Sequence, residues 1–216
     1  MSYGKLDGTI VLGGSYDPLH SGHTDYINQA ATLFQNVCLA VWNPSKDHSY
    51  KNMLLTAEER VSILNNWLGG LTDRVHTSII PGHGNDIGIY TSDIFKEYTG
   101  VNLLDRGNVL GLTLKYPSLD VEQRRLMHYG GNTSPDQINV IWFMRTHDAS
   151  LSSTGIKQLL IDAIKFGGYE KYQHVLTEFL VEDTIPGSTY DFFVEEHMIP
   201  RLLEHEKELE RRKCRK

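Results

Sequence analysis

Apolar and polar positions follow two spacings along roughly the first 165 residues, one typical of strands and the other of helices. Short continuous apolar runs predict buried strands. These runs cover residues 9–12, 37–41, 75–80, 101–104 and 139–144. The first run ends at Gly13-Gly14, which predicts a tight turn directly after the opening strand.

Between these runs, apolar residues recur every three or four positions, which is the spacing of an amphipathic helix. The first such stripe comprises Ile27, Ala30, Ala31 and Phe34. Its helix should begin near Gly22. Thr56 and Glu59 form the pattern of a capping box, which predicts that a second helix starts there. Two more helices are predicted, over residues 86–98 and across an apolar stripe at residues 156–164.

Strands that alternate with helices predict a parallel sheet with helices on both faces. We therefore expect an α/β fold with a Rossmann-like, doubly wound, parallel five-stranded sheet over residues 1–165. Ligands bind such sheets beyond the carboxyl ends of the strands. Residues 166–216 are aromatic and acidic at first and densely charged at the end, which predicts a helical C-terminal appendage.

Composition narrows the choice of partners. The 216 residues include 21 Lys and Arg against 27 Asp and Glu, for a formal net charge of −6. A mildly acidic chain is a poor general nucleic-acid binder, because phosphate neutralisation needs concentrated positive charge. Cys38 and Cys214 are too few for a disulfide scaffold or a Cys-rich zinc site. The polar start of the chain and the lack of an apolar run of about 20 residues favour a cytoplasmic protein with no membrane partner.

The segment that joins the first predicted strand to the first helix concentrates the chemistry. Residues 13–23 read GGSYDPLHSGH. Glycines let the backbone approach a ligand closely, and a helix N-terminus presents N–H groups and a partial positive charge, so this junction predicts a phosphate site. There His20 and His23, which flank Gly22, would donate to phosphate oxygens. The alternatives are that the two histidines cap the helix or bind a metal.

A second cluster of hydroxyl groups opens the helix predicted near residue 156. Ser152, Ser153 and Thr154 come directly before its apolar stripe. Capping the helix needs only one of these hydroxyls, so we favour a phosphate-binding role for the cluster over capping alone. Lys157, one turn further along, would add a cation near the same place.

Both segments resemble motifs of the nucleotidylyltransferase superfamily. Residues 13–23 are similar to its Gly-Gly-(Thr/Ser)-Phe-Asp-Pro-x-(His/Thr)-x-Gly-His signature, with Tyr16 in place of the usual Phe. Residues 151–157 (LSSTGIK) are similar to its Ile-Ser-Ser-(Thr/Ser)-x-(Ile/Val)-(Arg/Lys) motif. Across residues 9–165 the chain is most similar to phosphopantetheine adenylyltransferase, as in the order of the segments VCLAV, NPSK and LTAEERV.

This resemblance implies transfer of AMP from ATP to 4′-phosphopantetheine with release of pyrophosphate, a step of coenzyme A biosynthesis. The expected partners are then ATP and a small phosphorylated acceptor. The resemblance also implies that Mg²⁺ accompanies ATP and that the protein has no metal site of its own. It further suggests a homo-oligomer.

The resemblance implies a role for each matching residue. His23 would contact the α-phosphate and His20 the β- or γ-phosphate, and with Lys46 they would form the catalytic set. Ser15 and Lys46 would bind the acceptor phosphate. The implied nucleotide contacts are Gly14, Ser15, Tyr16, Gly22, His23, Arg106, Gly107, Ser152, Ser153 and Thr154.

Departures from the family leave the acceptor open. Val109 stands where the family has the second arginine of its Arg-Gly-Leu-Arg motif, which starts here at Arg106. An insertion separates Lys46 from Leu55. A histidine at the position of His20 is commoner in adenylyltransferases that act on nicotinate or nicotinamide mononucleotide, so that reaction is the first alternative. A cytidylyltransferase is the second, and a nucleotide-binding module without turnover is the third.

Overall fold

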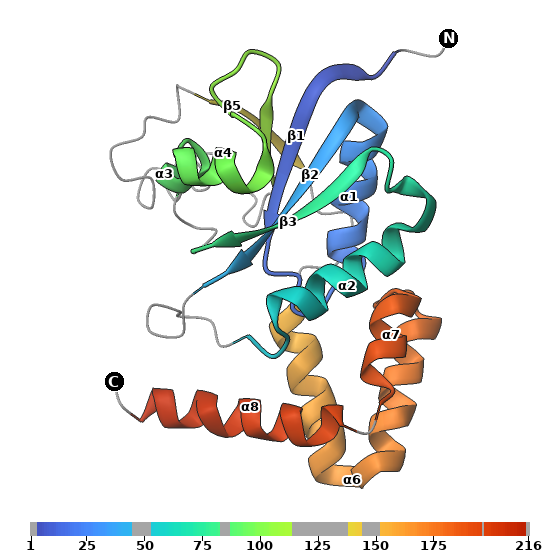
Figure 1. Ribbon diagram of the computed structural model, residues 1–216. Helices are drawn as coiled ribbons and strands as arrows, with labels where there is room; N and C mark the ends of the chain where they lie inside the picture. The colour runs from blue at the N-terminus through green and yellow to red at the C-terminus, as the bar shows by residue number, and fades with distance from the viewer. Residues whose placement is uncertain are drawn as a thin grey trace.

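The strands form a parallel sheet that is covered by helices on both faces (Figure 1). A computed structural model describes residues 4–44, 53–82, 87–113, 138–143, 152–195 and 197–214. Within these ranges five parallel strands stand in the order β3-β2-β1-β4-β5. Their bounds are β1 Leu6–Gly14, β2 Phe34–Asn43, β3 Val75–Pro81, β4 Val109–Thr113 and β5 Asn139–Phe143. The α/β, Rossmann-like fold predicted from the sequence is confirmed.

Helices connect the strands and continue beyond them. The described helices are α1 Ser21–Leu33, α2 Ala57–Leu68, the short 3-10 helix η1 Gly69–Leu71, α3 Ile87–Tyr90, α4 Asp93–Thr99, α6 Ser153–Val181, α7 Gly187–Phe193 and α8 Met198–Lys213. Figure 1 shows α1 and α2 on one face of the sheet and α3 and α4 on the other. Helices α6, α7 and α8 gather beyond the edge at which β1, β2 and β3 end (Figure 1).

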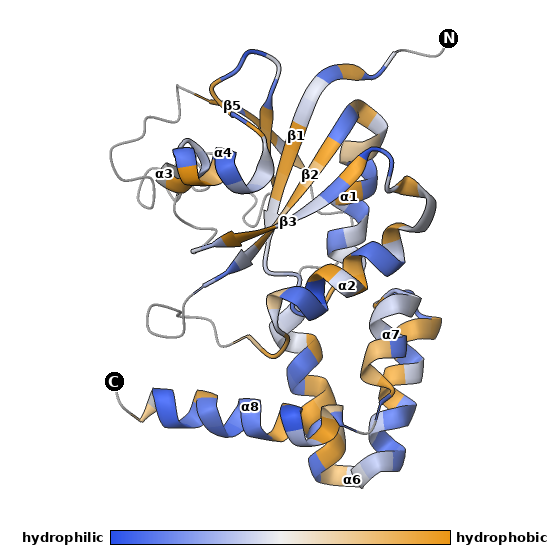
Figure 2. Ribbon diagram, in the orientation of Figure 1, coloured by the Kyte–Doolittle hydropathy of each residue, from blue (hydrophilic) through white to orange (hydrophobic). Residues whose placement is uncertain are grey.

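Successive residues of the central strands contribute to two separate cores. Ile10 and Leu12 belong to the cluster under α1 and α2, whereas Val11 belongs to the cluster under α3 and α4. All three side chains are fully buried. Figure 2 shows that the strands are mostly hydrophobic, whereas α8 is mostly hydrophilic. A sheet buried on both faces requires such continuous apolar strands, which explains why they stand out in the sequence.

The strand predicted at residues 101–104 is wrong in position. These residues lead into turns in which the N–H of Asp105 donates to the Asn102 carbonyl, and the N–H of Asn108 to the Asp105 carbonyl, each at 3.1 Å. The fourth strand in sequence is β4, which starts at Val109. Asn, Asp and Gly favour turns through their local hydrogen bonds and backbone freedom, and here they outweigh the neighbouring leucines.

The helix predicted over residues 86–98 is divided into α3 and α4. The hydroxyl of Ser92 accepts a hydrogen bond from the N–H of Phe95 at 3.2 Å, so Ser92 is the N-cap of α4. An N-cap residue has an extended backbone, which interrupts any helix that would pass through it.

The C-terminal helices share a core with the sheet. Tyr172 of α6, Phe193 of α7 and Leu202 of α8 are fully buried in the cluster that also contains Ile10 and Leu12. Helix α6 continues past residue 165, where the sequence predicts a domain boundary. It kinks at Gly168, whose φ of 65° is not helical. Of the helices described, none is long and apolar enough to cross a membrane.

Candidate active site

The loop between β1 and α1 lies where the order of the strands reverses. From β1 the chain passes through α1 to β2 on one side, whereas β4 pairs with β1 on the other side. In open parallel sheets this arrangement leaves a crevice at the carboxyl ends of the strands, and ligands bind there. Because β1 ends at Gly14, residues 15–20 begin at that crevice.

His20 and His23 lie together at the N-terminus of α1. Their ring centroids are 3.9 Å apart, with an interplanar angle of 35°. His20 is the N-cap residue and is 6% exposed, whereas His23 in the first turn is half-buried. The N–H of His23 donates to the His20 carbonyl at 2.7 Å, which closes the first turn of the helix. Two imidazoles at a helix N-terminus, where the helix dipole favours negative charge, suit an anionic ligand.

The glycines of the motif make room for neighbouring rings. A Cβ at Gly22 would lie 3.0 Å from Cε1 and 3.1 Å from Nδ1 of His20, so a side chain there would press on the imidazole. A Cβ at Gly14 would lie 2.7 Å from the ring of Tyr16. The sequence motif predicts that a ligand approaches closely at both glycines. The structure shows that a side chain of the protein also lies close to each of them, His20 at Gly22 and Tyr16 at Gly14.

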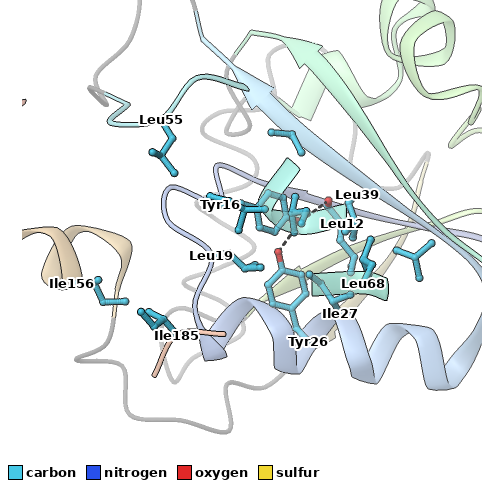
Figure 3. Packing of buried hydrophobic residues seen from close by; sticks show 14 of the residues in the cluster. Leu12, Tyr16, Leu19, Tyr26, Ile27, Leu39, Leu55, Leu68, Ile156 and Ile185 are labelled. Carbon is cyan, nitrogen blue, oxygen red and sulfur yellow. Dashed lines mark hydrogen bonds between the residues drawn. The ribbon is translucent and has the colours of Figure 1, made fainter. Parts of the chain in front are cut away.

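Tyr16 supports the histidines from within the core. Its side chain is fully buried; its hydroxyl donates to the Leu12 carbonyl at 3.0 Å and accepts from the Tyr26 hydroxyl at 2.9 Å (Figure 3). Its ring centroid lies 5.0 Å from that of His23. Burial raises the pKa of Tyr16 well above its ordinary value, so the hydroxyl stays protonated. A buried ring cannot stack on a nucleotide, and we therefore replace the implied nucleotide contact of the Tyr16 side chain by a supporting role.

Asp17 anchors the loop to two distant segments. Its carboxylate accepts from the N–H groups of Leu54 and Leu55, at 3.0 and 2.9 Å, and from the ammonium of Lys157 at 2.7 Å. Asp17 is 2% exposed and Lys157 is 7% exposed. A buried charge needs such partners, because its loss of hydration is otherwise uncompensated. Lys157 is thus engaged with Asp17, and we revise its expected role as a cation for the ligand phosphates.

Two arginines extend this scaffold. The buried Arg60 donates to the carbonyls of Ser15 and Trp42, at 2.7 and 2.8 Å, and so ties together the carboxyl ends of β1 and β2. Arg201 of α8 forms a bidentate pair with Glu59, with N–O distances of 2.7 and 2.8 Å. The hydrogen bonds from Arg201 lower the pKa of Glu59, as expected for a charge-assisted pair.

The second motif meets the first through Ser153. Its hydroxyl donates to the Pro18 carbonyl at 3.2 Å, although the two residues are 135 positions apart. Ser152 is the N-cap of α6 and accepts from the N–H of Gly155 at 3.1 Å. Thr154 is exposed. The structure thus brings the hydroxyl cluster to the histidine loop, with Ser152 engaged in capping, Ser153 joining the two segments and Thr154 open to solvent.

Arg106 and Gly107 lie at the amino ends of the strands, opposite the carboxyl ends where the histidine loop begins. They precede β4, whose first residue Val109 pairs with Ile10 rather than with the end of β1. A Cβ on Gly8, near the start of β1, would contact the Gly107 carbonyl at 2.3 Å. The structure therefore does not bring Arg106 and Gly107 to the loop that carries the histidines, which follows the carboxyl end of β1. The expectation rests on the resemblance, which aligns Arg106 with the start of the family's Arg-Gly-Leu-Arg motif, whereas the structure puts Arg106 before β4.

Two predicted site residues remain, Ser15 and Lys46. Ser15, directly after β1, is half-buried and stands in the same loop as the histidines. Lys46 and most of the insertion that follows it lie outside the described residues.

Comparison with known proteins finds a family model that is similar to the part of the chain containing the histidine motif. Residues 11–81 match the family model described as Cytidylyltransferase-like. The chain is similar to this family over residues 11–81. The matched residues include both histidines, Asp17 and Arg60, whereas α6, α7 and α8 lie beyond them.

Known proteins that are similar to this chain include phosphopantetheine adenylyltransferases. The enzyme of Limosilactobacillus reuteri (strain DSM 20016) is 29% identical over 150 residues, which cover 69% of this chain and 75% of that protein. The enzyme of Micrococcus luteus is 40% identical over 55 residues, which cover 25% of this chain and only 32% of that protein. The family model and these relatives support a nucleotidyltransferase enzyme.

A solved structure agrees with the fold. The crystal structure of a Vibrio parahaemolyticus protein named as a nicotinate-nucleotide adenylyltransferase has a TM-score of 0.50 at 10% identity, over 88% of this chain and 100% of that chain. At this identity the likeness concerns the architecture alone.

Sequence reasoning missed three charged residues that hold the candidate site in place. Asp17 and Arg60 lie inside the quoted motifs, and an acidic residue beside proline in a glycine-rich turn is a signal that could have been used. Arg201 gave no signal, because its partner Glu59 is 142 positions away.

His205 of α8 provides a pH prediction for this scaffold. Burial and the nearby Lys157 lower its pKa from 6.5 to about 4, while Asp17 and Glu208 oppose the shift. Between about pH 6.5 and 4 the unfolded chain binds a proton that the folded chain does not, so the free energy of unfolding should decrease as the pH falls through this window. We expect a loss on the order of 2 kcal/mol from this residue.

Melting temperatures measured from pH 7 to pH 4 test this expectation. His205→Gln should melt with a smaller dependence on pH than the wild type. His174→Gln serves as the control, because His174 is 59% exposed in its side chain and should leave the pH dependence unchanged. Equal pH dependence in His205→Gln and the wild type would contradict the prediction.

Proposed function

We propose that this protein transfers AMP from ATP to 4′-phosphopantetheine and releases pyrophosphate, a reaction of coenzyme A biosynthesis. The observation that carries the proposal is the meeting of two motifs. The adjacent imidazoles of His20 and His23 lie at the start of α1, and the Pro18 carbonyl of the preceding loop accepts a hydrogen bond from Ser153. The similarity to the enzyme of Limosilactobacillus reuteri, which is named a phosphopantetheine adenylyltransferase, supports the choice of acceptor.

In this reaction a phosphate oxygen of the acceptor attacks the α-phosphorus of ATP. A new P–O bond forms, the bond from the α-phosphorus to the bridging oxygen breaks, and pyrophosphate leaves with the electron pair. The acceptor phosphate is already a nucleophile, so neither a covalent enzyme intermediate nor removal of a proton is needed. Catalysis then consists of positioning the two substrates and stabilising the charge that moves onto pyrophosphate.

We assign this stabilisation to the two imidazoles. His23 would donate to the α-phosphate and His20 to the β- or γ-phosphate, because both lie at the positive end of α1. Ser15 and Lys46 would bind the acceptor phosphate, and the exposed Thr154 would face the triphosphate. Mg²⁺ would enter as part of the MgATP substrate, with phosphate oxygens among its ligands.

Adenylyl transfer to a pyridine mononucleotide is the second candidate. His20 favours it, because the motif with histidine at this position is commoner in enzymes of that class. The ring of His20 lies beside that of His23, so the residue that carries this argument lies within the site.

Pyrophosphate release distinguishes the candidates. The full chain with MgATP is assayed against 4′-phosphopantetheine, nicotinate mononucleotide and nicotinamide mononucleotide in turn, and the series is repeated with CTP. We expect release with ATP and 4′-phosphopantetheine. Release with ATP and a pyridine mononucleotide alone would favour the second candidate, and release with CTP alone would favour a cytidylyltransferase.

Binding of ATP is measured in parallel by thermal shift. A ligand at about 100 times its dissociation constant stabilises a fold by about 2.7 kcal/mol, which raises the melting temperature measurably. Stabilisation by ATP without pyrophosphate release from any pair would contradict the proposed function and favour a nucleotide-binding module.

A further inference from the structure

We propose that residues 184–189, here called the connection, position the imidazole of His20, and that Thr189 is the side chain through which they do so. The connection runs from the end of the link after α6 into the first turn of α7. This connection lies outside the matched residues, in the part of the chain that the sequence predicts to be an appendage. The kinetic consequence rests on the proposed function, whereas the positioning itself does not.

The connection holds the peptide planes on both sides of His20. The hydroxyl of Thr189 donates to the Leu19 carbonyl at 3.0 Å, and this carbonyl belongs to the peptide unit that precedes His20. The N–H of Ser21 donates to the Thr184 carbonyl at 2.9 Å, and this N–H belongs to the peptide unit that follows His20. With both planes fixed, the φ of −147° and ψ of 169° at His20 are fixed too, and so is the direction of its Cα–Cβ bond.

The connection is itself held firmly enough to act as a support. Thr184 is 5% exposed, Ile185 1% and Thr189 1%. The N–H groups of Thr184 and Ile185 both donate to the Phe179 carbonyl, at 2.8 and 3.2 Å, which ties the start of the connection to the last turn of α6. A segment that is anchored by buried side chains and by backbone hydrogen bonds has little freedom to follow a displaced loop.

The direction of the His20 side chain matters because its ring lies against that of His23, with centroids 3.9 Å apart. If the Leu19 carbonyl lost its donor, this peptide plane would be free to rotate, and the imidazole would move with it. Displacement of a positioned group by an ångström can cost a factor of about 100 in rate. Thr189 would therefore act as a positioning residue that never touches the substrate.

Three variants isolate the hydroxyl. Thr189→Val removes the O–H and keeps the shape, and Thr189→Ser keeps the O–H. Thr177→Val is the matched control, since the exposed Thr177 uses its hydroxyl only for a hydrogen bond to the Gln173 carbonyl of its own helix. Two readouts are taken on the full chain, namely the NMR resonances and pH titrations of the His20 and His23 imidazoles, and kcat and KM for ATP.

We expect Thr189→Val to shift the His20 resonances and to lower kcat by about tenfold, with KM for ATP within about twofold of the wild type. Thr189→Ser should restore both readouts, and Thr177→Val should leave both unchanged. Unaltered His20 resonances in Thr189→Val, or equal effects of Thr177→Val, would overturn the inference even if the melting temperature fell. Should Thr189→Val not fold, Thr189→Ala removes the same hydroxyl and is judged by the same criteria.

The two proposals fail separately. If the wild type released no pyrophosphate from any substrate pair, the proposed function would fail, and the His20 resonances alone would decide the inference. If the wild type were active and Thr189→Val matched it in kcat and in the His20 resonances, only the inference would fail.

Discussion

Replacing His23 by alanine is expected to lower kcat by two or more orders of magnitude while the circular dichroism spectrum stays unchanged. The imidazole is half-buried at the N-terminus of α1, where it would donate to the α-phosphate as charge develops. Loss of one such donor costs about 3 kcal/mol of transition-state stabilisation in enzymes that depend on fixed hydrogen-bond donors. The measurement is pyrophosphate release with ATP and the acceptor that supports turnover in the wild type.

His174→Ala is the matched control for this variant. His174 is exposed on α6 and pairs with Glu178 on its own helix, so its removal should leave kcat near the wild-type value. Near-normal turnover in His23→Ala, with the control behaving as expected, would remove His23 from the mechanism and direct attention to His20.

Replacing Lys157 by methionine should produce the largest loss of stability among the variants considered. The change leaves the carboxylate of Asp17 buried without its cation, although the N–H groups of Leu54 and Leu55 still donate to it. Removing one partner of a buried ion pair costs about 3–5 kcal/mol. For a chain of this length the melting temperature should fall by about 10 °C.

A double variant and a surface control complete this test. Asp17→Asn in the Lys157→Met background removes the unpaired charge and should recover part of the lost stability. Lys207→Met removes a lysine from an exposed pair with Glu204 and should change the melting temperature little. The phosphate role that the sequence predicts for Lys157 leads to a different result, in which ligand-free stability is unchanged and only ATP binding weakens.

The central strands could be predicted from the sequence because both faces of the sheet are buried, which makes their apolar runs continuous. The strand β4 was missed for a reason that lies in packing. Gly111 interrupts its apolar pattern, and the structure explains this glycine, since a Cβ there would lie 2.4 Å from a methyl group of Leu12. Two leucines in the preceding turn give the stronger apolar signal, so the sequence predicts the strand at residues 101–104 instead.

The candidate site could be predicted only as far as its chemistry is local. His20, Gly22 and His23 fall within one turn of helix, so their spacing alone brings them together. The supports of that turn come from elsewhere in the chain, and no local pattern reveals them. Arg201 in particular lies on a helix whose charged sequence resembles a solvated surface, yet it binds the glutamate of the capping box at the start of α2.

The distances along the chain between the loop and its supports bear on how the protein folds. Lys157 binds a residue 140 positions earlier, and Thr189 binds one 170 positions earlier. Contacts of such long range form late, because the entropy of closing the intervening chain must be overcome before they contribute. During synthesis β1 and α1 emerge before α6 and α7, so the turn between β1 and α1 can form these contacts only once α6 and α7 have left the ribosome.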